Sequence, residues 1–188
     1  VAGAGGLMAM STTPDEVIIR AKRIRLVCFD VDGTLTDGRL IYDSHGGELK
    51  AFHVHDGQGL RLLEDSGIAV ALITARESAI VRARGPELRL RHVYTGVADK
   101  VKRIEVLRLE AGFEHSEIAY MGDDLPDLSC LQSVGLAACP SDALPVIRRH
   151  VHWCSDFAGG FGAARQLCDL ILQAQDRQTA LIGRFSAP

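Results

Sequence analysis

The sequence predicts an α/β fold: a Rossmann-like, doubly wound parallel sheet with a β-hairpin insertion and no cap domain. Short apolar runs, typical of strands that are buried on both faces, alternate along the chain with segments of helical periodicity. Such alternation implies parallel strands joined by right-handed crossovers, with helices covering both faces of the sheet. The stretch 38–54, whose apolar residues surround a polar Ser-His-Gly-Gly tip, is the one sizeable insertion.

The first predicted strand, 25–31, is rich in branched and aromatic residues and runs into an Asp-Gly-Thr turn. The stretch 38–54 is expected to form a β-hairpin, because Gly46-Gly47 can take the positive backbone angles that a tight turn needs. A helix over 56–66 follows, and Gly67 is its expected C-terminal cap.

Beyond Gly67 the alternation of strands and helices continues. Strands are predicted over 68–73, 92–94, 118–121 and 134–138. Helices are predicted over 77–84, 99–111, 125–131, 143–148 and 161–174. Gly112 ends the helix 99–111, and Gly159-Gly160 lead into the last helix.

The length of 188 residues fits one compact domain, which we expect over 21–176. A flexible leader is expected over 1–20, because its opening lacks the charged start and long apolar stretch of a signal peptide. Residues 177–188 are expected to be a C-terminal tail. The five cysteines include no CxxC pair, so reduced thiols and a cytoplasmic location are expected.

The charge pattern argues against two classes of partner. The formal net charge is −3 and no block of Lys and Arg stands out, whereas nucleic-acid binding depends on concentrated positive charge. No apolar run approaches the roughly 18–20 residues that cross a bilayer. We therefore expect neither a nucleic-acid partner nor a membrane span.

Polar side chains of unusual kinds gather where the predicted strands end. The first strand leads into Asp30 and Asp32, the second into Thr74 and Arg76, and the fourth into an acidic segment. The carboxylates of that acidic segment are Asp123, Asp124 and Asp127. If the first strand is central and the other two flank it, all three ends meet in one crevice, which is where doubly wound sheets bind ligands.

Converging carboxylates repel one another, and a hard cation such as Mg²⁺ relieves that repulsion. The same arrangement suits phosphoryl transfer, in which positive charge and hydrogen-bond donors balance the phosphoryl oxygens. Asp30 is the candidate nucleophile and Asp32 the candidate acid that protonates the leaving alcohol. Thr74 is a candidate hydrogen-bond donor to phosphate, and Lys100 a candidate fixed charge.

Each pattern alone also has a structural explanation. The Asp-Gly dipeptide is a common turn, Thr74 suits a helix N-cap, and Lys100 suits a solvated helix. The Gly-Asp-Asp-Leu-Pro-Asp segment fits a capped helix start. The order of all four elements, each at the end of the appropriate strand or helix, favours the catalytic interpretation.

The segments FDVDGTLTDG, LITAR, the Lys100 region and MGDDLPD resemble the signature motifs of the haloacid dehalogenase superfamily. The resemblance implies that Asp30 is the nucleophile and a magnesium ligand, and that Asp123 is a further ligand. It also implies that Asp32 is the acid/base residue, whose backbone carbonyl reaches the metal. Asp124 and Asp127 would then hold waters and Lys100.

Residues 25–175 resemble, more narrowly, the 3-deoxy-D-manno-octulosonate 8-phosphate phosphatase family, through the TDG-hairpin-FHVHDGQGL stretch and the GGFGAARQLCDLIL ending. The resemblance implies a capless homotetramer of lipopolysaccharide sugar synthesis, with the hairpins at its centre and each site completed by a neighbour. The residues that it places near the substrate or phosphate are Asp32, His53, Val54, His55, Asp56, Gly57, Arg61, Arg76, Arg84 and Lys100. Arg is suited to this role, because a phosphorylated sugar acid carries two anionic groups.

Two departures from the family pattern leave the substrate open. His55 stands where Arg is expected, and Phe161 stands where a charged residue is common. The alternatives are a sialic-acid-type 9-phosphate phosphatase, a broad sugar phosphatase, a phosphotransferase or mutase, and a catalytically silent tetramerising module. The absence of a cap that would exclude water favours hydrolysis over transfer. His53 and His55 form an HxH pair, but no third soft ligand for zinc is evident.

Overall fold

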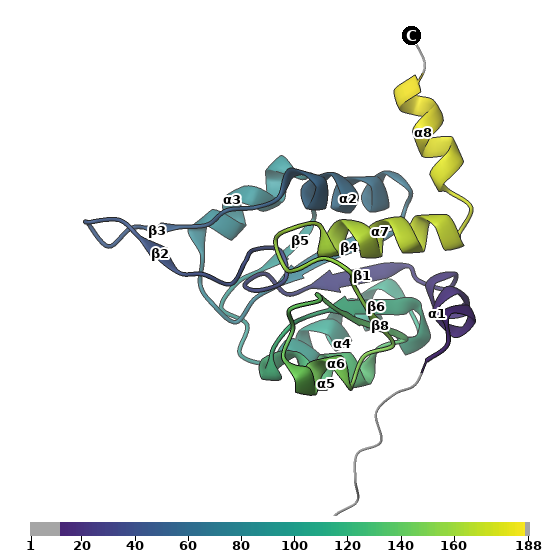
Figure 1. Cartoon of the computed structure of the whole chain (residues 1–188), viewed down its shortest axis with the longest axis horizontal. Coiled ribbons are helices and arrows are strands. Elements are labelled where there is room, and N and C mark those ends of the chain that lie inside the picture. The colour runs from purple at the N-terminus through teal and green to yellow at the C-terminus, as the bar shows by residue number, and fades with distance from the viewer. Residues whose placement is uncertain (1–11, 187–188) are drawn as a thin grey trace, which may run out of the picture.

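The computed structural model describes residues 12–186 and confirms the predicted fold class (Figure 1). Its main sheet is six-stranded and parallel, with the order β5-β4-β1-β6-β7-β8. The strands are β1 (Leu26–Phe29), β4 (Ala69–Ile73), β5 (His92–Tyr94), β6 (Ile118–Met121), β7 (Leu136–Cys139) and β8 (Trp153–Cys154). β1 is central, and β4 and β6 flank it, so the three strand ends that carry the candidate site are neighbours.

Helices cover both faces of this sheet, as Figure 1 shows. The helices are α1 (Pro14–Ala21), α2 (Val54–Asp65), α3 (Ala79–Glu87), α4 (Lys100–Ala111), α5 (Leu128–Ser133), α6 (Pro145–Arg148), α7 (Ala163–Ala174) and α8 (Gln178–Ser186), with 3₁₀ turns at His115–Glu117 and Leu125–Asp127. Of these, α8 extends away from the sheet beyond α7 (Figure 1). The first core lies between the sheet and α1, α2, α3 and α7, and the second between the sheet and α4, α5 and α6.

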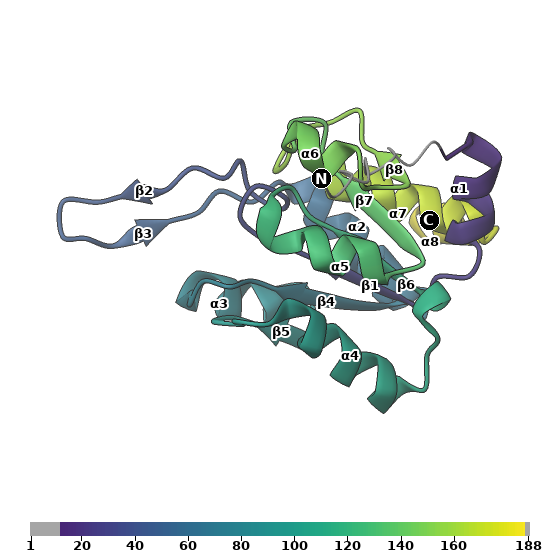
Figure 2. The same cartoon turned by 90° about the horizontal axis from the view of Figure 1, so that it is seen from below.

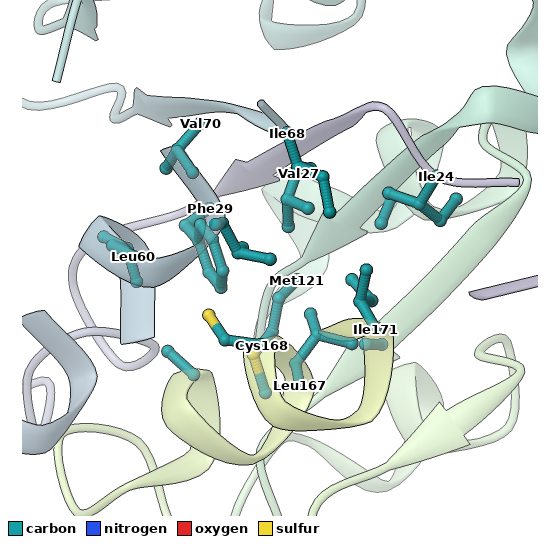
Figure 3. Close-up of a cluster of buried hydrophobic side chains, with 14 of the residues drawn as sticks. Ile24, Val27, Phe29, Leu60, Ile68, Val70, Met121, Leu167, Cys168 and Ile171 are labelled. Atoms are coloured by element: carbon teal, nitrogen blue, oxygen red, sulfur yellow. The ribbon is translucent and has the colours of Figure 1, made fainter. Parts of the chain in front are cut away.

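Alternate residues of β1 supply the two cores, as the period of a strand requires. Val27 and Phe29 point into the first core, whereas Leu26 and Cys28 point into the second. Figure 3 shows Val27 and Phe29 packed with side chains of α7 such as Leu167. All four residues of β1 are buried, which fixes the strand that carries Asp30 at its end.

The predicted hairpin is present and projects from the body of the domain (Figures 1 and 2). β2 (Ile41–Tyr42) pairs with β3 (Glu48–Leu49) in antiparallel register. At the tip, the Asp43 side chain accepts hydrogen bonds from the amides of His45 and Gly47, at 2.8 Å each. Gly46 alone of the glycine pair takes a positive φ, +82°.

The flexible-leader prediction for 1–20 is wrong for its last residues, because Pro14–Ala21 form α1. Thr13 caps this helix in a reciprocal pair with Glu16, and Val17 and Ala21 are buried, so both capping and packing stabilise it. Residues 1–11 of the predicted leader lie outside the described residues. At the other end, Gln178–Ser186 of the predicted tail form α8.

The remaining differences concern short elements. β8 was not predicted, and the predicted helix 125–131 begins with a 3₁₀ turn before α5 starts at Leu128. The last long helix begins at Ala163 rather than 161, after Gly162 in the left-handed region. Within residues 12–186, no helix is long and apolar enough to cross a membrane.

Candidate active site

Asp30 follows β1 directly and lies beside Lys100, the first residue of α4. The Asp30 amide donates to the Met121 carbonyl oxygen at 2.9 Å, which ties the end of β1 to β6. The Lys100 ammonium group donates to Asp30 Oδ1 at 2.6 Å and to Asp127 Oδ1 at 2.7 Å. All three side chains are buried. A buried lysine with two carboxylates is a fixed positive charge rather than a solvated helix residue.

Asp127 organises the acidic loop that follows β6. Its Oδ1 also accepts from the hydroxyl of the buried Tyr120, at 2.6 Å. Its Oδ2 accepts from the amides of Asp123 and Asp124, at 3.1 and 3.3 Å. Both oxygens of Asp127 are therefore engaged in holding Lys100 and the loop. The Asp124 side chain itself caps the 3₁₀ turn, accepting from the Leu125 amide at 2.6 Å.

Asp30, Asp123 and Asp127 can bring one carboxylate oxygen each within 4.8 Å of one another. Because Asp127 is already engaged, Asp30 and Asp123 are the better candidates to hold a cation. Asp123 lies close against Gly33: a Cβ at Gly33, where φ is +91°, would lie 2.1 Å from Asp123 Oδ2. Glycine is thus required for the loop after β1 to approach this carboxylate.

The electrostatics of the pair fit a divalent cation. Burial, with the nearby charge of Asp127, raises the pKa of Asp30 to about 7 against the opposing effect of Lys100. Burial and Asp127 likewise raise the pKa of Asp123 to about 7. Two crowded, poorly hydrated carboxylates are an oxygen-only donor set, which favours Mg²⁺ over soft metals.

Thr74 and Arg76 lie in the loop after β4, on the other side of β1. The Thr74 amide donates to the Tyr94 carbonyl oxygen at 3.0 Å, and its hydroxyl accepts from the Arg76 amide at 3.1 Å. The Arg76 guanidinium donates to Glu48 Oε1 at 2.7 Å. Arg76 is therefore held by a residue of the hairpin, a contact that the sequence motifs do not reveal.

Lys50 is a residue of this site that the sequence analysis missed. It directly follows β3, and its ammonium group contacts Asp32 Oδ1 and lies 3.3 Å from Glu48 Oε1. The Lys50 side chain is only 1% exposed. The available signal was the spacing of Glu48 and Lys50, because residues two apart on an extended strand share one face.

The other predicted substrate residues have their described contacts outside the carboxylate cluster. Asp56 accepts from the amides of Gly162 and Arg165, at 3.3 and 2.8 Å, and so joins α2 to α7. Arg84 pairs with Glu87 at 2.9 Å and lies over the Phe52 ring. A Cβ at its neighbour Gly57 would lie 2.7 Å from Arg84 Nη2.

The start of α2 presents several exposed side chains. Val54 is 72% exposed, and His55 is also exposed beside the edge of the His53 ring. His53 caps the helix by accepting from the His55 amide at 3.3 Å. Arg61, further along α2, is half-buried, and Phe161 in the loop before α7 is 59% exposed. Their described hydrogen bonds and ring contacts do not involve Asp30.

No protein-family model matches the chain. It is 41% identical over 169 residues to the 3-deoxy-D-manno-octulosonate 8-phosphate phosphatase of Yersinia pestis, covering 90% of each protein. A crystal structure of a hypothetical protein from Xanthomonas campestris superposes with a TM-score of 0.91 and 51% identity, over 95% of this chain and 97% of that one.

A further solved structure contains ligands. It is the 3-deoxy-D-manno-octulosonate 8-phosphate phosphatase of Moraxella catarrhalis in complex with a magnesium ion, a phosphate ion and a KDO molecule. It superposes with a TM-score of 0.90 and 41% identity, covering 93% of this chain and all of that one. These likenesses extend over nearly the whole chain.

Proposed function

The chain belongs to the 3-deoxy-D-manno-octulosonate 8-phosphate phosphatase family of the haloacid dehalogenase superfamily, and from this we propose that it hydrolyses 3-deoxy-D-manno-octulosonate 8-phosphate. The observation that carries the proposal is the buried group of Asp30, Lys100 and Asp127, with Asp123 beside it, where the ends of β1 and β6 meet the start of α4. A group of this composition is suited to a phosphoryl group and a hard cation.

We propose Mg²⁺ as the cofactor, held by Asp30, Asp123 and the backbone carbonyl of Asp32. When bound, it supplies positive charge that offsets the phosphoryl oxygens and the carboxylates. Lys100 supplies a second, permanent positive charge on the side of Asp30. Asp127 and Asp124 keep this arrangement in place through their contacts with Lys100 and the loop.

Hydrolysis would proceed in two steps. In the first, an Asp30 carboxylate oxygen forms a bond to phosphorus while the bond between phosphorus and the sugar oxygen breaks. The leaving oxygen takes a proton from the Asp32 carboxyl group. In the second step, water gives a proton to Asp32 and attacks phosphorus, which releases phosphate and restores the Asp30 carboxylate. Thr74 donates a hydrogen bond to the phosphoryl group throughout.

Recognition of the sugar acid would need a second copy of the chain. Among the predicted substrate residues of α2, Val54 and His55 are exposed on the monomer. The hairpin also exposes Leu40, Ile41, Tyr42 and Leu49, and exposed apolar surface of this kind marks an assembly interface. We propose a homotetramer in which a neighbouring subunit completes the site. The five unpaired cysteines support a cytoplasmic location.

The test is phosphate release, with and without Mg²⁺, from the eight-carbon substrate, a sialic-acid-type 9-phosphate and simple sugar phosphates. We expect a Mg²⁺-dependent preference for the eight-carbon substrate. Asp30→Asn should reduce turnover to background while the variant still unfolds as a folded domain on heating, and the exposed Asp15→Asn is the matched control. Equal rates across the panel would support a phosphatase but contradict the eight-carbon sugar acid phosphate as its substrate. Normal turnover by the Asp30 variant would overturn the proposed mechanism.

A further inference from the structure

The hairpin contributes more to the site than an assembly surface. We propose that Lys50 is a positioning residue that orients the Asp32 carboxyl group for proton transfer to the leaving alcohol. The inference rests on the proposed function, in which Asp32 is the acid, and it adds a residue and a role for the hairpin. Three observations carry it: the burial of Lys50, its partners, and the state of the second Asp32 oxygen.

Lys50 is not an ordinary edge-strand lysine. A lysine on an exposed hairpin usually extends into solvent, where it discourages pairing with other strands. The Lys50 side chain is instead 1% exposed, although Leu49 next to it is 55% exposed. Burying an ammonium group is costly unless carboxylates compensate it, and here Asp32 and Glu48 do so. The chain thus turns this lysine inward to the catalytic loop.

The two oxygens of Asp32 have different surroundings. Oδ1 accepts from the Lys50 ammonium group, whereas Oδ2 is buried and has no hydrogen-bond partner. An orphaned buried carboxylate oxygen is costly, so it is expected where a ligand or a proton completes it. With Oδ1 held by Lys50, Oδ2 is the atom left to carry the proton that passes to the leaving oxygen.

Glu48 connects this pair to the opposite loop. Its Oε1 lies 3.3 Å from Lys50 Nζ and 2.7 Å from Arg76 Nη2. Alternating charges therefore run from Asp32, after β1, through the hairpin to Arg76, after β4. Without Lys50, nothing in this chain of contacts would hold the Asp32 carboxyl group against rotation about its side-chain bonds.

The first experiment compares leaving groups in Lys50→Met, Lys50→Arg and a matched control, Lys22→Met, whose lysine is exposed at the far end of α1. The measured quantity is kcat/KM, which covers the steps up to phosphorylation of Asp30. The sugar alkoxide needs a proton in order to leave, whereas p-nitrophenolate does not. Lys50→Met should lower kcat/KM for 3-deoxy-D-manno-octulosonate 8-phosphate by roughly 10–100-fold, which is part of the roughly 10²–10⁴-fold that a general acid contributes.

For p-nitrophenyl phosphate, the same variant should change kcat/KM by less than about threefold, because no acid is required. Lys50→Arg should recover part of the loss, and Lys22→Met should match the wild type on both substrates. An equal loss on the two substrates would overturn the inference, because Lys50 would then act on the phosphoryl group or on the fold. Thermal unfolding of each variant shows whether the fold is intact.

A double-mutant cycle with Asp32→Asn decides whether Lys50 acts through Asp32. If it does, Lys50→Met should have no further effect on kcat/KM for the sugar phosphate once Asp32 is replaced. Multiplying losses would overturn the inference and indicate that Lys50 contacts the sugar acid itself. Failure of the proposed function would look different, since the wild-type protein would then show no preference for this substrate.

Discussion

The cluster around Lys100 and the hairpin differ in how their side chains are buried and paired. In the cluster, each charge is buried and meets its partner within the same chain: Lys100 contacts Asp30 and Asp127, and Asp127 contacts Tyr120. On the hairpin, apolar side chains such as Ile41 and Tyr42 are 45% and 57% exposed. The two regions lie at the same end of the sheet, yet only the first has its side chains buried against partners of the same chain.

This difference separates the reaction from the recognition of the substrate. The groups that would break the phosphate ester are held by the sheet and by buried hydrogen bonds, so they need no partner. The surfaces that would select the sugar acid include exposed residues such as Val54 and His55, and in the proposed tetramer a neighbour would complete them. The hairpin contacts the loops next to the cluster at two points: Lys50 contacts Asp32 after β1, and Glu48 contacts Arg76 after β4.

The largest effect on activity is expected when Lys100 is replaced, because the buried cluster then loses its positive charge. Lys100→Met leaves Asp30 and Asp127 buried without a positive charge, and we expect kcat to fall by at least about 10²-fold. Removing one partner of a buried ion pair also destabilises a fold, by roughly 3–5 kcal/mol. Phosphate release and thermal unfolding measure the two effects. The exposed Lys102→Met on the same helix is the control; near-normal rates in Lys100→Met would contradict a fixed charge at this position.

Substitutions on the hairpin should instead affect the assembly and KM, and leave the fold of the domain intact. Replacing the paired Ile41 and Leu49 by Ser should dissociate the assembly in sedimentation velocity while leaving the thermal unfolding of the domain nearly unchanged. KM for the sugar acid phosphate should rise roughly tenfold or more, as expected if one charged hydrogen-bond partner is lost. Leu109→Ser, at an exposed leucine of α4, is the control. A wild-type monomer would refute the tetramer.

The same division explains how much could be predicted from the sequence. The strands of the centre were predictable because their apolar runs are buried on both faces: β6 begins and ends at the predicted residues, and β1 and β4 lie within the predicted runs 25–31 and 68–73. The convergence of the segments that hold Asp30, Thr74 and Asp123 followed from the rule that ligands bind where neighbouring parallel strands end. Both inferences use local patterns of a few residues.

The features that were not predicted depend on contacts between distant residues. The Lys50–Asp32 contact joins positions 18 apart, and only the path of the hairpin brings them together. β8 has two residues, too few to show a period. α1 is different, because its capping box, Thr13 with Glu16, is a local sequence pattern that indicates the start of a helix.

The smallest expected effect concerns a buried hydrogen bond away from the site and the pH dependence of stability that it causes. The His152 ring accepts from the Ala137 amide at 2.9 Å, which requires a neutral nitrogen. Burial and the charge of Arg20 lower the pKa of His152 from 6.5 to about 4. Between these values the unfolded chain binds a proton that the folded chain does not. The free energy of unfolding should therefore fall as pH decreases from about 6.5 towards 4, and the full contribution is present above 6.5.

Because the His152 ring is half-buried, we expect this loss to be about 1–2 kcal/mol rather than the full value of the shift. Urea unfolding at pH 7 and pH 5 measures it. In His152→Asn the side-chain oxygen can accept the same amide without titrating, so the difference between the two pH values should shrink relative to wild type. His45→Asn, at an exposed histidine of the hairpin, should leave it unchanged. An unchanged pH dependence in His152→Asn would show that the ring is protonated as easily in the folded state as in the unfolded one.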